Sequence, residues 1–95
     1  MVKVDTIEGV VDDYLWCHYD LAGDVLYLRL VRHRDAPAYS EETDDGVILV
    51  RRQDDDSVVG MTIVNWWKRF GSGPLPDSIH ELAEAIEPWA RKVAA

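Results

Sequence analysis

Four aspartates are the residues of this sequence whose types and spacing could support chemistry. Asp20 and Asp24 flank a predicted turn, and Asp44 and Asp45 precede a later apolar run. Carboxylate oxygens bind hard cations and exchange protons, so these four together would predict a metal site or an acid–base site. Aspartates in turns also accept hydrogen bonds from backbone N–H groups, which explains Asp20 and Asp24 without a ligand. We therefore predict no metal and no cofactor, and keep a metal-binding protein or enzyme that uses these carboxylates as an alternative.

The other reactive side chains show no catalytic arrangement. The run Asp54-Asp55-Asp56 lacks the spaced ligands and the central glycine of a calcium loop. Cys17 and His18 are neighbours in a predicted strand, so their side chains point to opposite faces and cannot form a nucleophile pair. The sequence contains no phosphate-binding loop, dinucleotide fingerprint or nucleophile elbow. We therefore predict no catalytic residues and no enzyme activity.

The charge of the chain limits its partners. The sequence has 18 Asp and Glu against 10 Lys and Arg, which gives a net charge of -8. This charge repels phosphate backbones and anionic membranes, and it favours a small basic protein as a partner. The sequence also has no long apolar run, no apolar leader and only one cysteine. These features predict a cytoplasmic protein that does not enter a membrane.

A segment rich in aromatic residues and cations gives a further alternative. The run Trp66-Trp67-Lys68-Arg69-Phe70 is typical of stacking on single-stranded nucleic acid, and also of a strand end whose rings cover the core. The net negative charge disfavours the first interpretation, so we expect no nucleic acid partner. The alternative that stays open is a nucleic-acid-associated regulator that uses Arg29, Arg51, Arg52, Lys68 and Arg69.

Alternation and turn signals predict the strands that must position these residues. The runs 14–19 and 24–31 are rich in aromatic and branched residues and are separated by a short polar turn, which predicts a β-hairpin. The runs 47–52 and 58–66 predict a second hairpin in the same way. The connection between the hairpins is expected to hold a short extended piece at 38–41.

A helix is predicted after the sheet. Ser78 followed three residues later by Glu81 forms a capping box, and apolar residues then recur at helical spacing. Pro88 lacks a donor N–H, so it is expected to interrupt the helix within the four residues before it. The chain is thus predicted to be one α+β domain: a four-stranded antiparallel sheet of two β-hairpins (14–66), with one C-terminal helix (78–93) packed on one face. Residues 1–13 fit neither period, and their structure is left open.

The predicted sheet is apolar on both faces, but one helix can cover only one of them. The third and fourth strands carry apolar residues at consecutive positions, which a sheet with one wet face would not show. Residues 1–13, a second copy of the chain or another protein must therefore cover the second face. We expect self-association through that face as a homodimer, with aromatic and arginine residues as its anchors. The candidate interaction surface comprises Trp16, Tyr27, Arg29, Arg51, Trp66 and Trp67.

The first predicted hairpin contains Tyr19-Asp20, then Asp24 after three residues, then Leu26-Tyr27 after one more residue. This spacing resembles the pattern of a known family, DUF2283, a domain of unknown function, which has Tyr-Asp, three variable residues, Asp, one variable residue and Leu-Tyr. Glu41 and the segments 45–49 and 58–63 match in order, so the resemblance covers about residues 14–66. The chain departs from the pattern where the family shows acidic residues, at Arg51, Arg52 and Thr62.

The resemblance implies a role without a known reaction. Members of this family are small bacterial proteins, some of them found as companions of small toxin-like proteins. By this resemblance the chain is expected to have an antitoxin-like or adaptor role. Together with the acidic charge and the apolar second face of the sheet, this predicts a protein-binding module that acts as a homo-oligomer.

Overall fold

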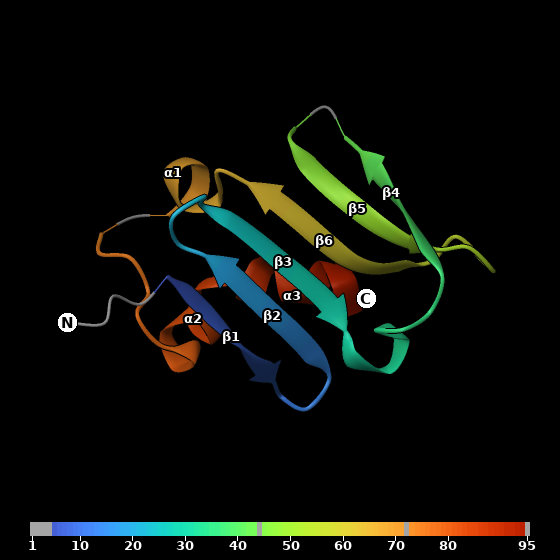
Figure 1. The fold of residues 1–95 in the computed structure, drawn as a ribbon, viewed down its shortest axis with the longest axis horizontal. Coiled ribbons are helices and arrows are strands. Elements are labelled where there is room, and N and C mark those ends of the chain that lie inside the picture. The colour runs from blue at the N-terminus through green and yellow to red at the C-terminus, as the bar shows by residue number, and fades with distance from the viewer. Residues whose placement is uncertain (1–4, 44, 72, 95) are drawn as a thin grey trace.

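The chain folds as a single antiparallel sheet with its helices on one face (Figure 1). A computed structural model describes residues 5–43, 45–71 and 73–94. The strand order is β1-β2-β3-β6-β5-β4, so the predicted hairpins β2–β3 and β5–β6 are both present and pair through β3 and β6. The elements are β1 (Thr6–Val11), β2 (Leu15–Asp20), β3 (Val25–Leu30), the 3-10 helix η1 (Val31–His33), β4 (Ala38–Glu42), β5 (Val47–Arg52), β6 (Val58–Val64), α1 (Trp66–Phe70), α2 (Ile79–Ala85) and α3 (Glu87–Ala94).

The sheet has six strands, and the prediction of four was wrong because both edge strands lack a clear apolar alternation. In β1 the middle inward position is Gly9, where a Cβ atom would lie 2.8 Å from Cγ1 of Ile79. The close approach of α2 thus requires a glycine where the pattern needs an apolar side chain. In β4, the predicted extended piece, Tyr39 to Glu42 are all exposed, as is usual for an edge strand.

The predicted C-terminal helix is present as two helices, α2 and α3, which meet at Ile86. The break lies just before Pro88, as its missing N–H predicts. The Ser78 half of the capping box is confirmed, because Ser78 Oγ accepts a hydrogen bond from Glu81 N at 3.2 Å. Glu81 Oε2 accepts from Asp77 N at 2.9 Å, one residue before the N-cap residue from which a capping box would accept.

The core lies between the sheet and the two C-terminal helices. Inward positions alternate along each central strand, and α2 packs on β1 while α3 packs on β3 and β6. Full burial of each large apolar side chain contributes about 1.5–3 kcal/mol, so this layer holds the sheet and the helices together. The buried hydrophobic side chains of this core are Ile7, Leu15, Cys17, Tyr19, Leu26, Leu28, Leu30, Val59, Met61, Ile63, Trp66, Leu82, Ile86, Ala90 and Val93.

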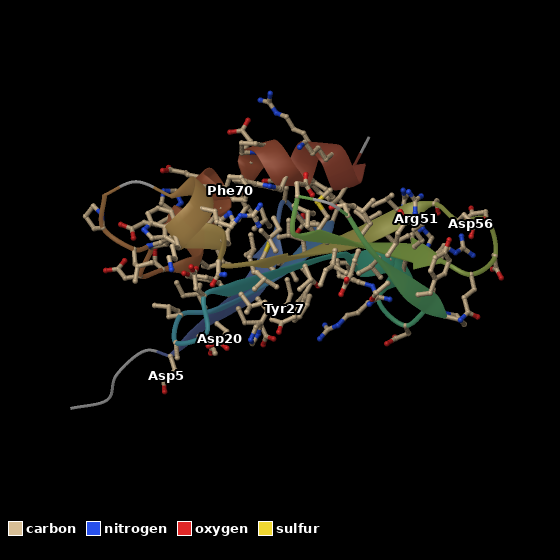
Figure 2. All side chains as sticks on the ribbon, turned by 90° about the horizontal axis from the view of Figure 1, so that it is seen from above. Asp5, Asp20, Tyr27, Arg51, Asp56 and Phe70 are labelled. Carbon is tan, nitrogen blue, oxygen red and sulfur yellow. The ribbon has the colours of Figure 1, made fainter. Side chains whose placement is uncertain are left out.

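The opposite face of the sheet carries no helix among the described residues, and we call it the open face. Figure 2 shows Tyr27 and Asp20 projecting from this side, away from the helices. Residues 6–11 extend the sheet as β1, with Ile7 buried on the helix side, so they do not cover the open face. Residues 1–4, the start of the segment 1–13 that was predicted as a possible cover, lie outside the described residues. No described helix is long and apolar enough to cross a membrane.

Candidate interaction surface

The open face is built from outward side chains that the strand register places in rows across the sheet. Because side chains alternate along each strand, every second residue of the six strands belongs to this face. One row runs through Val10, Trp16, Arg29, Gly60, Val50 and Ser40, and the next runs through Glu8, His18, Tyr27, Thr62, Ile48 and Glu42.

Three aromatic rings lie together near β2 and β3. The rings of Trp16 and His18 stack with centroids 5.8 Å apart, and His18 meets Tyr27 edge-on at 5.7 Å. The guanidinium of Arg34 lies 5.1 Å from the Trp16 ring, in cation–π geometry, and Glu8 Oε1 lies 3.1 Å from His18 Nδ1. This arrangement holds flat aromatic surface and positive charge side by side on the open face.

Arg29 extends the positive charge toward the centre of the sheet. It faces Gly60 on β6, where a Cβ atom would lie 3.1 Å from Cδ of Arg29, so the glycine leaves room for the side chain to lie across the strand. Nη2 donates to the carbonyl of Ala36 at 3.5 Å, and Nε is buried without a hydrogen-bond partner within the described part of the chain. A buried donor without a partner costs free energy, so packing over Gly60 and not hydrogen bonding at Nε holds this side chain in place.

The open face also exposes apolar surface. Tyr27 is 38% exposed, Val10 50% and Val64 40%, and Ile48 is half-buried. A hollow of about 220 Å³ is lined by Glu42, Thr43, Gly46, Ile48 and Val64. Exposed apolar side chains that gather on one face, beside anchoring aromatic and arginine side chains, are typical of an interaction surface.

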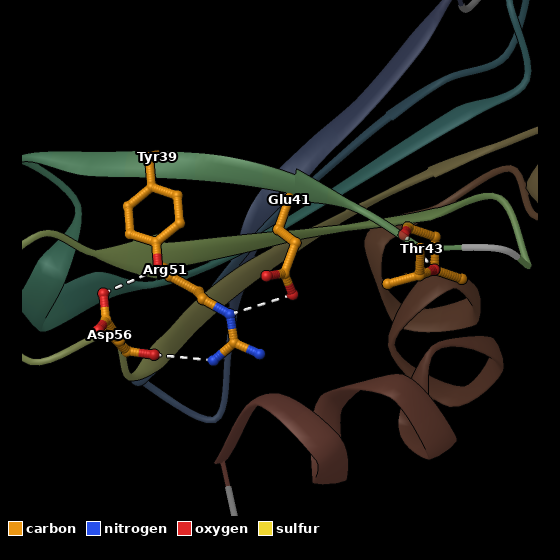
Figure 3. Close-up of polar contacts among 6 residues, drawn as sticks. Tyr39, Glu41, Thr43, Arg51 and Asp56 are labelled. Atoms are coloured by element: carbon orange, nitrogen blue, oxygen red, sulfur yellow. Dashed lines mark hydrogen bonds and ion pairs between the residues drawn. The ribbon is translucent and has the colours of Figure 1, made fainter.

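Three residues of the sequence-predicted surface lie together on this face: Trp16, Tyr27 and Arg29. Arg51 does not lie on it. Arg51 projects to the helix side at the end of β5 (Figure 2). Its Nε donates to Glu41 Oε1 at 3.3 Å, and Nη1 donates to the carbonyl of Asp56 at 2.8 Å, while Tyr39 donates to the Asp56 carboxylate at 2.8 Å (Figure 3). These contacts tie β4 to β5 and to the following turn.

The two adjacent tryptophans do not belong to the open face either. Trp66 is 1% exposed and packs edge-on against Tyr19, so its assignment to an interaction surface is corrected by burial. Trp67 is half-buried, with its ring against Gly71 and Trp66. Both residues belong to α1, which folds back after Asn65 at φ 56° and so turns Trp66 into the core.

The predicted carboxylate cluster is used for hydrogen bonds in turns. Asp20 Oδ1 accepts from Gly23 N at 3.2 Å, and Asp45 accepts from Thr43 Oγ1 and Val47 N. No group of three or more His, Cys, Asp or Glu in the described ranges is arranged to hold a metal ion, and Asp44 lies outside those ranges. Asp20, Asp24 and Asp45 therefore support the turns in which they lie.

The carboxylate of Asp24 accepts three hydrogen bonds. Its Oδ1 accepts from Tyr19 Oη at 2.7 Å and from Trp67 N at 2.9 Å, and its Oδ2 accepts from Lys68 N at 3.0 Å. Burial alone would raise the pKa of Asp24, but these three hydrogen bonds outweigh it and hold the pKa below its usual value. The ionised carboxylate thus caps the N-terminus of α1, the element that places Trp66 in the core.

A comparison with protein families identifies the chain. The family described as a protein of unknown function, DUF2283, matches residues 16–66. The chain belongs to the DUF2283 family. Neither the curated proteins nor the solved structures contain a match.

The structure explains several residues of the DUF2283 pattern in this chain. Tyr19 donates a hydrogen bond to Asp24, whose carboxylate also accepts from the backbone of α1, and Asp20 closes the β2–β3 turn. Cys17 faces the core and His18 faces outward, as adjacent strand residues must. Burial raises the pKa of the Cys17 thiol to about 12, so the thiolate needed for nucleophilic attack does not form near neutral pH.

Part of the open face was not predicted from the sequence. His18, Arg34 and Val64 belong to the open face but were not among its candidates. The alternation of β2 and β6 could have assigned His18 and Val64 to this face. Arg34 lies beyond β3, and its position over Trp16 depends on the turn at η1, which gives no periodic signal. The cations of the nucleic-acid alternative are divided: Arg29 and Arg52 lie on the open face, Arg51 on the helix side, and Lys68 and Arg69 in α1.

Proposed function

We propose that this DUF2283 chain is a protein-binding module that acts as a homodimer through its open face. The observation that carries this proposal is the gathering of Trp16, Tyr27 and Arg29 with exposed valines on the face that the described helices leave bare. A two-fold axis lets one such patch bind its own copy, which makes a homodimer the simplest cover.

The size and charge of the open face support this pairing. Six strands about 4.8 Å apart and about 20 Å long give an area of the same order as the roughly 800 Å² that each partner buries in a standard interface. Arg29 and Arg34 lie on the β2–β3 side, near the end where η1 follows β3, and Glu8 and Glu42 lie at the two edges. A second copy, offset across the face, can place its carboxylates over these guanidinium groups.

The partner of such a dimer would be a small basic protein of the cytoplasm, in an antitoxin-like or adaptor role. On the open face Arg29, Arg34 and Arg52 balance the carboxylates of Glu8, Asp20 and Glu42, so the net charge of -8 lies on the rest of the chain. A negative surface speeds the encounter with a positive protein and disfavours acidic competitors. This role is the one that the family resemblance suggests by association.

Two tyrosines of equal exposure give a matched test of the open face. Tyr27 lies on it, whereas Tyr14 lines a hollow beside α2 and α3, and each is 38% exposed. We expect Tyr27→Glu to weaken self-association at least tenfold in sedimentation velocity, because a buried unpaired carboxylate is costly, and Tyr14→Glu to leave it unchanged. A wild-type chain that stays monomeric at millimolar concentration, or equal effects of both variants, would contradict the proposal.

The partner is tested separately by affinity capture from the native cell, followed by mass spectrometry. The expected result is one small basic protein that co-purifies at low salt and is lost as salt screens the charges. Recovery of the chain alone would leave self-association standing and remove the basic partner. Recovery of nucleic acid would favour the alternative role.

A further inference from the structure

The outer edge of the sheet at β4 has unused backbone hydrogen-bonding groups. Gln53 N donates to Pro37 O and Thr43 N donates to Val47 O, so the odd-numbered residues of β4 bond to β5. Backbone groups alternate in direction along a strand. Ala38, Ser40 and Glu42 therefore point their N–H and C=O groups away from β5, and no described strand pairs with them.

The charges along β4 are arranged so that the strand complements itself when reversed. Its C-terminal half carries Glu41 and Glu42, and its N-terminal half lies beside Arg51 and Arg52, which pair with Tyr39 and Ala38. A second β4 running antiparallel and centred on Ser40 places Ala38 opposite Glu42 of the copy. The glutamate then lies two strand spacings, about 10 Å, from Arg52, with only the small Ala38 between them.

Arg52 has capacity for this contact. Its Nη2 binds Asp54 at 2.9 Å and its Nη1 lies 3.9 Å from Asp55, but both aspartates are mostly exposed. A guanidinium has five N–H donors, so the partner glutamate can be added to these contacts. Charged side chains usually keep edge strands apart, but here the antiparallel register brings opposite charges together.

The other edge of the sheet lacks this complementarity. Leu21 N donates to Asp5 O, so in β1 the outward backbone groups belong to Thr6, Glu8 and Val10. An antiparallel pair centred on the middle residue would place Glu8 directly opposite Glu8 of the copy, which like charges disfavour.

We propose that β4 pairs with β4 of a second copy, antiparallel and centred on Ser40, so that two chains share one continuous sheet. This contact is separate from the open-face contact and goes beyond the proposed function. In the joined sheet, the open faces of the two copies lie next to each other and point in the same direction. If both contacts form, the chain assembles as a tetramer with dihedral symmetry; if only the β4 contact forms, it assembles as a dimer.

The first test removes an outward donor. Ser40→Pro deletes an N–H that faces away from β5, and edge strands tolerate proline at such a position, whereas Ser40→Ala keeps the N–H. Sedimentation velocity of the full chain should show that Ser40→Pro halves the mass of the assembly and that Ser40→Ala matches wild type. Circular dichroism confirms that each variant is folded. The proposal is overturned if a folded Ser40→Pro chain keeps the wild-type mass.

The second test exchanges the charges and does not depend on proline being tolerated. Glu42→Arg and Arg52→Glu each place like charges across the contact, so each should weaken assembly about tenfold or more, and the double variant should recover it. Two single variants without effect, or a double variant no better than either, would overturn the pairing.

Hydrogen exchange separates this contact from the open-face contact. The amides of Ser40 and Glu42 should gain protection as the concentration rises, while those of Glu8 and Val10 should not. Tyr27→Glu should leave this concentration dependence intact. If the β4 amides stay unprotected in a chain that still dimerises, the β4 contact is excluded and the open-face contact stands. If the β4 amides are protected and Tyr27→Glu has no effect on assembly, the open-face contact is excluded and the β4 contact stands.

Discussion

Asp24 and Trp67 are joined by a hydrogen bond across 43 residues of sequence, with 2.9 Å between Asp24 Oδ1 and the backbone N of Trp67. The same carboxylate binds Lys68 N and Tyr19 Oη, and the carbonyl of Asp24 accepts from Trp66 N at 3.2 Å. A residue of the β2–β3 turn thus supplies the N-terminal cap that Asn65, in left-handed conformation and without a side-chain cap bond, does not provide. The aspartate that suggested a metal ligand therefore connects the first hairpin to α1.

We expect Asp24→Asn to lower the free energy of unfolding by about 1 kcal/mol, because the charge that binds the N–H groups of α1 is lost. Asparagine keeps the left-handed backbone that Asp24 adopts at φ 54°. Asp12 has a similar φ of 51° and lies in the β1–β2 turn, so Asp12→Asn is the matched control and should change stability by less. Urea denaturation followed by tryptophan fluorescence measures both; equal losses would contradict a capping role.

The stabilisation by Asp24 should depend on pH. The pKa of Asp24 lies below its ordinary value in the folded chain, so the carboxylate binds protons less readily when folded than when unfolded. Its contribution is complete above the unfolded pKa of about 3.9 and is lost as the pH falls through the lower folded pKa. The difference in unfolding free energy between wild type and Asp24→Asn should therefore shrink from about pH 5 to about pH 2. A difference that stays constant over this range would show that the charge of Asp24 does not stabilise the fold.

Cys17 should be inert while the chain is folded. Its side chain is buried, and burial raises the pKa of the thiol to about 12, so little thiolate is present at pH 8. A disulfide reagent such as Ellman's reagent should label Cys17 only at the rate of unfolding, and at once in urea. Rapid labelling of the native chain would show that β2 opens locally.

Elements held by local interactions could be predicted from the sequence, and elements held by distant ones could not. The hairpins β2–β3 and β5–β6 were predicted because alternation and turn residues are local signals. Helix α1 was missed because its cap comes from Asp24, far away in sequence. For the surface, alternation shows which residues of one strand share a face, but not which of the two faces the helices cover. Arg51 lies on the same face of β5 as Leu49, which is the helix side. Arg29 is paired with Trp16 on the open face.

Gly60 should be the most sensitive glycine of the sheet. A Cβ atom there would lie 2.5 Å from the carbonyl oxygen of Leu28 and 3.1 Å from Cδ of Arg29. The first contact is with backbone, which cannot move without opening the β3–β6 pairing. Gly60→Ala should therefore lower the unfolding free energy by about 1–3 kcal/mol, the usual cost of overpacking.

Gly9→Ala is the matched comparison for Gly60→Ala, because its Cβ atom would meet only the side chain of Ile79, at 2.8 Å from Cγ1 and 2.9 Å from Cδ1. Ile79 is half-buried and can change rotamer, so this variant should cost less. Gly60→Ala should also displace Arg29 from its place across β6 and so weaken the open-face contact, which Gly9→Ala should not do. Chemical denaturation ranks the two stabilities, and sedimentation compares the two assemblies. If Gly9→Ala were the more damaging in both measurements, the close packing of Arg29 over Gly60 would not be what shapes the open face.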